Sequence, residues 1–138
     1  MADVSVALRW RGEGLRFEGG APDAAAVDID GDGASGASPM QALLLALAGC
    51  TGADVVEILG KMRLSPAGLT VRVDGDRAPE PPRRYTSVRI VYELEGIQAD
   101  EEPKVRRAVE LSQEKYCSVM HTFRRDVRFE TDVVLRAG

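Results

Sequence analysis

Residues 38–50 read SPMQALLLALAGC, a complete helix start followed by an apolar run. Ser38 is a preferred N-cap, Pro39 suits the first helical position, and Gln41 completes a capping box. The pattern predicts a helix from Pro39 to about Met62. Its first half has no polar face, which is typical of a helix inside a protein or a membrane, but the uninterrupted run is too short to span a bilayer.

A helix that is apolar all round has to be covered on every side. A chain of 138 residues has few other elements for this purpose, so we expect a second copy of the chain to cover part of the helix in a homodimer. Gly49 and Gly52 each cost about 1 kcal/mol relative to alanine within a helix. We expect them to permit the close approach of a neighbouring element.

The flanking sequence predicts the remaining elements. Alternating patterns before the helix indicate strands at 4–10, 15–18 and 26–30. After it, strands at 69–74 and 87–94 flank a Pro- and Arg-rich connection, a second helix runs from near Asp100 into Cys117, and a last strand covers 127–135. The order β-β-β-α-β-β-α-β predicts an α+β fold, with antiparallel sheets packed on two main helices in a single domain of residues 1–138.

The composition argues against several classes of function. Aromatic residues make up 5% of the chain and the formal net charge is −4, which disfavours base stacking and a general attraction to nucleic acid or anionic lipid. The first five residues have neither the basic nor the apolar region of a secretion signal. We therefore expect a cytoplasmic protein that binds neither nucleic acid nor membrane.

Cys50 and Cys117 are the only cysteines. Two are too few for a disulfide-rich secreted scaffold or a four-ligand zinc site. In a reducing cytosol each is either a buried small apolar residue or a redox-active thiol. If residues 118–123 are helical, the single histidine, His121, shares a face with Cys117 and could help to hold a thiolate. A metal site made of these three residues is a weaker alternative, because it lacks a fourth ligand.

The segment DIDGDG at 28–33 is similar to the start of a calcium-binding loop. The twelfth position of such a loop supplies a bidentate glutamate, and here that position is Pro39. An acidic, solvated turn is therefore the better interpretation.

Three segments together resemble the OsmC and organic-hydroperoxide-resistance (Ohr) family: SPMQ at 38–41, AGCT at 48–51 and EKYCSV at 114–119. The Pro-Met start is similar to a less characterised branch of that family. The resemblance implies an intertwined α+β homodimer with the two cysteines near the dimer interface. It also implies that Cys50 attacks the peroxide and becomes a sulfenic acid, that Cys117 resolves it as a disulfide, and that a dithiol reductant restores both.

The resemblance further implies that no metal or bound organic cofactor is needed, and that an N-terminal arginine stabilises the attacking thiolate. Arg9, Arg11 and Arg16 are candidates, and Arg16 is preferred because of its place in the predicted return strand. The peroxidase members hold this arginine with a glutamate at the start of the apolar helix. This sequence has Met40 at that position.

The sequence therefore predicts a thiol peroxidase for organic hydroperoxides, acting in oxidative stress defence, with Cys50, Cys117 and Arg16 as catalytic residues. The alternative is a dimer that binds a small hydrophobic ligand, with the cysteines packed or sensing redox state. Sulfurs close enough to form a disulfide after modest movement, with an arginine near Cys50, favour the enzyme. Sulfurs far apart, or a sealed Cys50, favour the binding protein.

Overall fold

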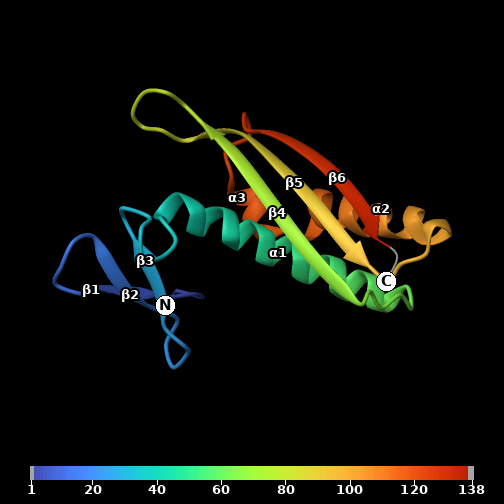
Figure 1. Ribbon diagram of the computed structural model, residues 1–138, viewed down its shortest axis with the longest axis horizontal. Coiled ribbons are helices and arrows are strands. Elements are labelled where there is room, and N and C mark those ends of the chain that lie inside the picture. Colours follow the sequence, from blue (N-terminus) through green and yellow to red (C-terminus); the bar gives the residue numbers. More distant parts are fainter. Residues whose placement is uncertain (1, 137–138) are drawn as a thin grey trace. The chain divides into compact units, whose positions relative to one another are not determined.

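The computed structural model describes residues 2–136, which fall into an N-terminal unit of residues 1–43 and a C-terminal unit of residues 44–138. The boundary lies in the first turns of α1 (Pro39–Lys61), the long helix in Figure 1. The Ser38 N–H donates to Gln41 Oε1 at 2.9 Å, and the Gln41 N–H donates to Ser38 Oγ at 3.1 Å. The predicted helix start and the capping role of Gln41 are confirmed.

The N-terminal unit contains a three-stranded antiparallel sheet. Its strands are β1 (Ala7–Trp10), β2 (Arg16–Gly20) and β3 (Val27–Asp30), in that order. The β1–β2 turn is closed by the Arg11 N–H, which donates to the Arg16 carbonyl at 2.8 Å. Gly12 and Gly14 in this turn have φ angles of 92° and 54°, which glycine adopts without steric cost.

This sheet has no apolar core of its own. The buried hydrophobic side chains found among residues 2–136 all belong to the C-terminal unit. On the N-terminal strands, Trp10 is 55% exposed and Val27 is 53% exposed. Because three strands need an apolar face against another element for stability, this unit depends on a surface outside itself.

The C-terminal unit contains a second three-stranded sheet. Its strands are β4 (Gly68–Arg77), β5 (Tyr85–Glu95) and β6 (Arg128–Arg136), in that order. Strands β4 and β5 form the predicted antiparallel hairpin, but β5 and β6 are parallel, with Tyr92 opposite Val133. The prediction of antiparallel sheets is therefore wrong for the pairing of β5 with β6. Parallel neighbours need a long crossover, and the helical segment between them provides it.

That segment is more divided than the single predicted helix from Asp100 to Cys117. It comprises the 3₁₀ turn η1 (Ala99–Glu101), α2 (Glu102–Leu111), the π-helical turn η2 (Ser112–Tyr116) and α3 (Ser118–Thr122). Cys117 stands between η2 and α3, with an extended backbone at φ −74° and ψ 99°. The π turn adds one residue to the helical repeat, as is frequent at functional sites, and the break at Cys117 starts a new helix.

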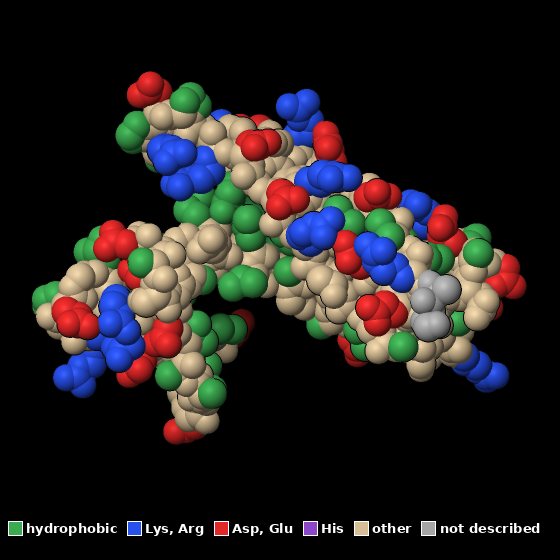
Figure 2. Space-filling model, in the orientation of Figure 1, with side chains coloured by type: hydrophobic (Ala, Val, Ile, Leu, Met, Phe, Trp, Pro, Cys, Tyr) green, Lys and Arg blue, Asp and Glu red, His purple; other side chains and the backbone are tan. Residues whose placement is uncertain are grey.

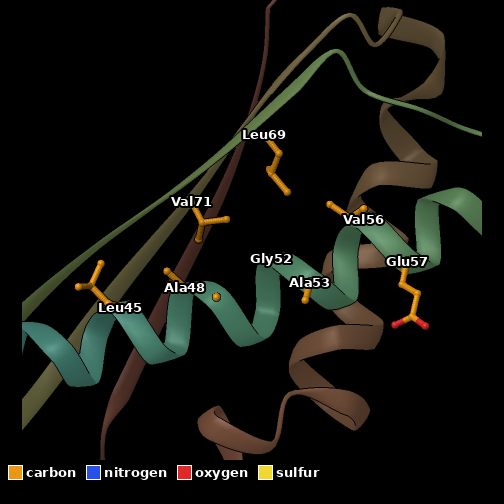
Figure 3. Close-up of a pocket in the computed structure, with 9 residues that line it drawn as sticks. Leu45, Ala48, Gly52, Ala53, Val56, Glu57, Leu69 and Val71 are labelled. Carbon is orange, nitrogen blue, oxygen red and sulfur yellow. The ribbon is translucent and has the colours of Figure 1, made fainter. Parts of the chain in front are cut away.

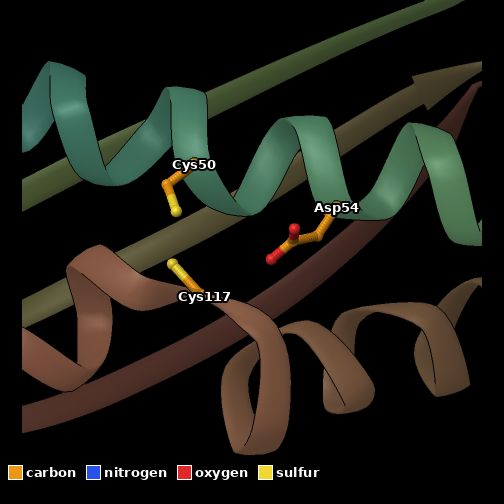
Figure 4. A group of neighbouring side chains, drawn as sticks. All are labelled: Cys50, Asp54 and Cys117. Carbon is orange, nitrogen blue, oxygen red and sulfur yellow. The ribbon is translucent and has the colours of Figure 1, made fainter. Parts of the chain in front are cut away.

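The core of the C-terminal unit lies between its sheet and its helices. In Figures 1 and 4, α1 and the helical segment lie side by side against one face of the sheet. Alternate residues of β5 face them, as expected for a strand with one buried face. Many of the fully buried side chains of this core come from α1, β5 and α2, among them Leu47, Val55, Leu59, Val88, Ile90, Tyr92, Leu94 and Val105. The predicted α+β class and element order are confirmed.

Helix α1 is long and apolar enough to cross a membrane by length and composition, with a mean hydropathy of 1.8 in its most apolar window. A core helix passes the same test. One stripe of α1, which includes Leu47, Thr51, Val55 and Leu59, is buried against the rest of the unit. This regular spacing is that of a helix packed on a protein core.

Acidic and basic side chains alternate over the C-terminal unit in Figure 2. Across the sheet, Arg72 pairs with Glu93 at 2.9 Å and Arg89 lies 3.9 Å from Asp132. On the face drawn in Figure 2, the described side chains form no continuous basic patch of the kind that attracts a phosphate backbone.

Candidate functional site

Two adjacent turns of α1 carry the first half of the site. Cys50 and Asp54 are four residues apart on α1, and this spacing places both side chains on the same face of a helix. Both are half-buried. Both point toward the segment that carries Cys117 (Figure 4).

Cys117 supplies the second half from the break between η2 and α3. Its side chain is fully buried. The Met120 N–H donates to Cys117 Sγ at 3.4 Å, so the sulfur serves as the N-cap of α3. The sulfur is therefore held by the backbone of the turn that follows it.

The structure brings the two predicted cysteines together. The sulfurs of Cys50 and Cys117 and a carboxylate oxygen of Asp54 all lie within 4.8 Å of one another (Figure 4). Both cysteines are free thiols. A disulfide requires the sulfurs to approach to about 2.0 Å, so a modest movement separates this arrangement from a disulfide. The short distance between the sulfurs is the first of the two features expected of an enzyme, and the second, an arginine near Cys50, stays a prediction.

The surroundings of Cys117 keep it protonated. Burial raises the pKa of this thiol to about 11, although the Met120 N–H opposes the shift by stabilising the thiolate. The neighbouring Cys50 thiol and the Asp54 carboxylate raise the pKa further. At neutral pH, Cys117 is a thiol and needs a proton acceptor before it can act as a nucleophile.

A buried chain of hydroxyl groups leads to Asp54. The Thr51 hydroxyl lies 2.7 Å from both the Tyr92 and the Ser112 hydroxyls, and Ser112 donates to Asp54 Oδ2 at 2.9 Å. At its other end, Gln113 Nε2 donates to the Tyr92 hydroxyl at 3.0 Å. The side chains of Thr51, Tyr92 and Ser112 are fully buried, so each depends on these partners.

His121 lies away from this cluster. Its backbone N–H donates to the Cys117 carbonyl at 3.2 Å, which confirms the predicted helical turn. Its ring Nε2, however, is paired with the Gln113 carbonyl oxygen at 3.0 Å, and the side chain is exposed. The three grouped potential metal ligands found among residues 2–136 are the two cysteines and Asp54. The alternative of a metal site with His121 as its third ligand is therefore wrong, because Asp54 takes that place in the cluster.

This group offers a metal two sulfurs and one oxygen. Structural zinc sites are closed by four protein ligands, and sites with three keep an open position. Asp54 was missed by the sequence analysis. Its spacing of four residues from Cys50 was the available signal, because a carboxylate at that distance shares a helix face with the thiol.

The N-terminal arginines belong to the other unit. Arg16 on β2 donates to Glu13 Oε1 at 2.9 Å, and Arg11 lies 3.7 Å from Asp28 Oδ1. Arg9 lies on β1. The acidic partner of Arg16 is thus Glu13, in the preceding turn. The activating role of Arg16 stays a prediction.

The acidic segment 28–33 is organised by its own backbone. Asp30 is buried and accepts hydrogen bonds from the N–H groups of Asp32, Ala34 and Ser35 and from the Ser35 hydroxyl. These donors lower the pKa of Asp30 to about 2. Its carboxylate is used to hold the loop, which agrees with a turn rather than a calcium site.

An open apolar groove of about 900 Å³ runs along the C-terminal unit between α1 and β4. Its walls are shown in Figure 3 and include Leu45, Ala48, Gly52, Ala53, Val56, Glu57, Leu69 and Val71. A Cβ atom at Gly52 would lie 3.3 Å from Val71 Cγ2, so the predicted close approach is found there. At Gly49, a Cβ atom would meet nothing within 4 Å.

Both the sequence and the fold match those of known proteins. The profile described as OsmC-like protein matches residues 31–132, which include both cysteines and Asp54. Protein YhfA of Escherichia coli K12 is 38% identical over 117 residues, covering 84% of this chain and 86% of YhfA.

Solved structures of other proteins share the fold of this chain. A hypothetical protein from Aquifex aeolicus VF5 has a TM-score of 0.86 at 25% identity, covering 100% of this chain and 99% of that one. The organic hydroperoxide resistance protein OhrB of Bacillus subtilis shares the fold, with a TM-score of 0.64 at 16% identity, covering 96% of this chain and 98% of OhrB. The chain belongs to the OsmC-like protein family.

Proposed function

We propose that the protein is a two-cysteine thiol peroxidase that reduces organic hydroperoxides in oxidative stress defence. The observation that carries the proposal is the pair of free thiols within 4.8 Å, of which Cys50 is half-buried and Cys117 is fully buried. A reachable thiol beside a shielded one suits a division into an attacking and a resolving cysteine. The likeness in fold to an organic hydroperoxide resistance protein supports the same chemistry.

The proposed cycle has three steps. The Cys50 thiolate attacks the terminal oxygen of the hydroperoxide, the O–O bond breaks, and the alkoxide takes up a proton and leaves as an alcohol. Cys50 is then a sulfenic acid. Cys117 attacks the Cys50 sulfur, the S–O bond breaks, and water leaves as the disulfide forms. A dithiol reduces this disulfide and is itself oxidised to one. The cycle needs no metal or bound organic cofactor.

Activation of Cys50 requires a positive group near the sulfur. We assign this role to Arg16, whose guanidinium is held by Glu13 at 2.9 Å. Glu13 thereby takes over the task that Met40, at the family's glutamate position, cannot perform, because a thioether accepts hydrogen bonds only weakly. Replacing Arg16 by Gln is expected to lower the second-order rate with hydroperoxide on the order of 10-fold, the effect of one pKa unit. Arg9→Gln is the matched control.

A homodimer is part of the proposal. Leu45 and Val56 on the groove wall of α1 are 64% and 52% exposed, and soluble monomers rarely leave such a continuous apolar surface in water. The open space at Gly49 leaves room for another backbone. We assign a second copy of the chain to this groove, because the N-terminal sheet also lacks a core of its own. Two free thiols fit the cytoplasm, where such groups stay reduced.

The test is peroxide consumption with dithiothreitol as reductant, measured for the wild type, Cys50→Ser and Cys117→Ser. Cys50→Ser is expected to abolish turnover of cumene hydroperoxide. Without dithiothreitol, Cys117→Ser is expected to consume one equivalent of hydroperoxide and leave a sulfenic acid that dimedone traps. In the wild type, one equivalent of hydroperoxide is expected to remove two hydrogen atoms from the intact mass, reversibly with dithiol. Unchanged turnover in Cys50→Ser would refute the proposal.

The groove favours one second candidate, a dimer that binds a small hydrophobic ligand. Apolar concave surfaces of this size commonly hold such molecules. In that case a fluorescent fatty acid would bind with equal affinity to the wild type and Cys50→Ser, and neither would consume hydroperoxide.

A further inference from the structure

Cys117 is fully buried and holds its proton tightly, yet in the proposed cycle it has to attack Cys50. Its sulfur is fully buried and therefore shielded from bases in solution. The groups that act on it are the Met120 N–H, the Cys50 thiol and the Asp54 carboxylate, and the last two disfavour a standing thiolate. Attack by Cys117 therefore needs a proton acceptor inside the site that removes the proton as the sulfur reacts.

Asp54 is placed for this task. One of its oxygens lies within 4.8 Å of both sulfurs. The residue is half-buried, so it can exchange a proton with water while Cys117 cannot. A carboxylate that disfavours a permanent thiolate by its charge can still accept the thiol proton during the reaction.

The hydroxyl chain directs a hydrogen bond onto the Asp54 carboxyl group. The Ser112 hydroxyl donates to Asp54 Oδ2 at 2.9 Å. Ser112 must then accept from Thr51, and Thr51 must accept from Tyr92, because each hydroxyl has one proton to donate. Tyr92 in turn accepts from Gln113.

The orientation of the Gln113 amide is set independently. The Thr131 hydroxyl on β6 donates to Gln113 Oε1 at 3.0 Å, which directs Nε2 toward Tyr92. Every donor in the series, from Thr131 to Ser112, thus points toward Asp54. The Ser112 hydroxyl donates to Asp54 Oδ2, and a carboxylate has further lone pairs that can accept a proton from a thiol.

We infer that Asp54 accepts the Cys117 proton when Cys117 attacks the oxidised Cys50, and returns it to the leaving group. In the balanced step, the proton moves from Cys117 Sγ to Asp54, a bond forms between the two sulfurs, and the Cys50 S–O bond breaks. The departing hydroxide takes the proton from Asp54 and leaves as water. The inference rests on the proposed two-thiol chemistry, but it does not depend on the oxidant being a peroxide.

The test uses Asp54→Asn in the full-length protein. Asparagine keeps an oxygen that accepts the hydrogen bond from Ser112 but cannot take a proton from a thiol. The variant is therefore expected to fold normally and to lose only the proton acceptor. Asp100→Asn makes the same substitution at an exposed position in η1 and serves as the control. With one equivalent of cumene hydroperoxide and dimedone, Asp54→Asn is expected to accumulate the Cys50 sulfenic acid adduct, while the wild type and the control form the disulfide. Disulfide formation is expected to slow roughly 100-fold.

A second arm uses diamide in place of peroxide. Diamide oxidises Cys50 to a sulfenylhydrazide, and Cys117 must displace the hydrazide in the same resolving step. Slow disulfide formation in Asp54→Asn with both oxidants supports the inference. If the wild type reacts with diamide but not with peroxide, and Asp54→Asn is slow, the proposed function fails and the role of Asp54 stands. Equal rates of disulfide formation in Asp54→Asn and the wild type would overturn the role of Asp54.

Asp54→Ala provides an independent variant. Because Asp54 is half-buried, added formate can reach the space that the alanine leaves and act as a replacement base. Formate is expected to restore the rate of disulfide formation in Asp54→Ala and to leave the rate of Asp100→Asn unchanged. A purely structural role for Asp54 would show no such rescue, and that result would contradict the inference.

Discussion

The phenol oxygen of Tyr92 lies 2.7 Å from the hydroxyl oxygen of Thr51, although the two residues are 41 positions apart in the chain. This bond joins β5 to the helix that carries Cys50. Both side chains are fully buried, and a hydroxyl that loses a buried partner costs about 1–3 kcal/mol.

Thr51→Val should therefore lower the free energy of unfolding by about 1–3 kcal/mol, because it leaves Tyr92 and Ser112 each without one partner. Urea denaturation followed by circular dichroism measures the change. Thr70→Val, at an exposed position of β4, is the matched control and should change stability by less than about 0.5 kcal/mol. An equal change in both variants would mean that the hydroxyl chain contributes nothing to stability.

The buried thiol Cys117 predicts a loss of stability at alkaline pH. Its folded-state pKa of about 11 is higher than the usual value, so the folded state holds this proton more tightly than the unfolded chain. The resulting stabilisation is fully present below about pH 8.5. It should disappear as the pH rises through about 11. Urea midpoints between these limits should fall more steeply for the wild type than for Cys117→Ser, and parallel curves would contradict the assignment.

The exposed apolar wall of α1 predicts that single charges there separate the dimer. Leu45→Glu or Val56→Glu would place an unpaired carboxylate in the groove that we assign to a second copy. Light scattering coupled to size-exclusion chromatography should show a monomer for either variant and a dimer for the wild type. Gln98→Glu, at an exposed position outside the groove, should remain a dimer. A monomeric wild type would disprove the assignment.

The buried Asp30 predicts a loss of loop order in acid. Its pKa of about 2 lies below the usual value, so the hydrogen bonds that it accepts stabilise the folded loop above about pH 4. That contribution should decline below pH 4 and vanish as the pH falls through about 2. Amide hydrogen exchange at Ser35, whose N–H donates to Asp30 at 2.9 Å, reports the change. Asp30→Asn should show rapid exchange at Ser35 already at neutral pH.

The parts of the structure that could be predicted depend on local rules. The pattern around Ser38 and Gln41 predicted where α1 begins, because a capping box involves neighbouring residues only. The direction of β6 could not be read in this way. Its alternating pattern is the same for parallel and antiparallel pairing, and only the crossover before it decides between them.

The same difference between local patterns and long-range contacts applies to the residues of the site. The cysteines can be predicted because they are rare and carry a family resemblance, whereas in the sequence Asp54 is one acidic residue among many. Its importance comes from Ser112 and Cys117, which lie about 60 positions further along the chain and reach Asp54 only in the folded protein. His121 is the opposite of Asp54. It is close to Cys117 in sequence, but its ring pairs with the Gln113 carbonyl and lies away from the sulfurs.

The first three strands bury no apolar side chain within their own unit. In the proposed dimer, the surface of a second copy completes them, and folding would then be a bimolecular reaction. The free energy of unfolding of such a protein increases with its own concentration. Dilution would then lower its free energy of unfolding. The amount of protein that the cell synthesises would set the fraction that is folded.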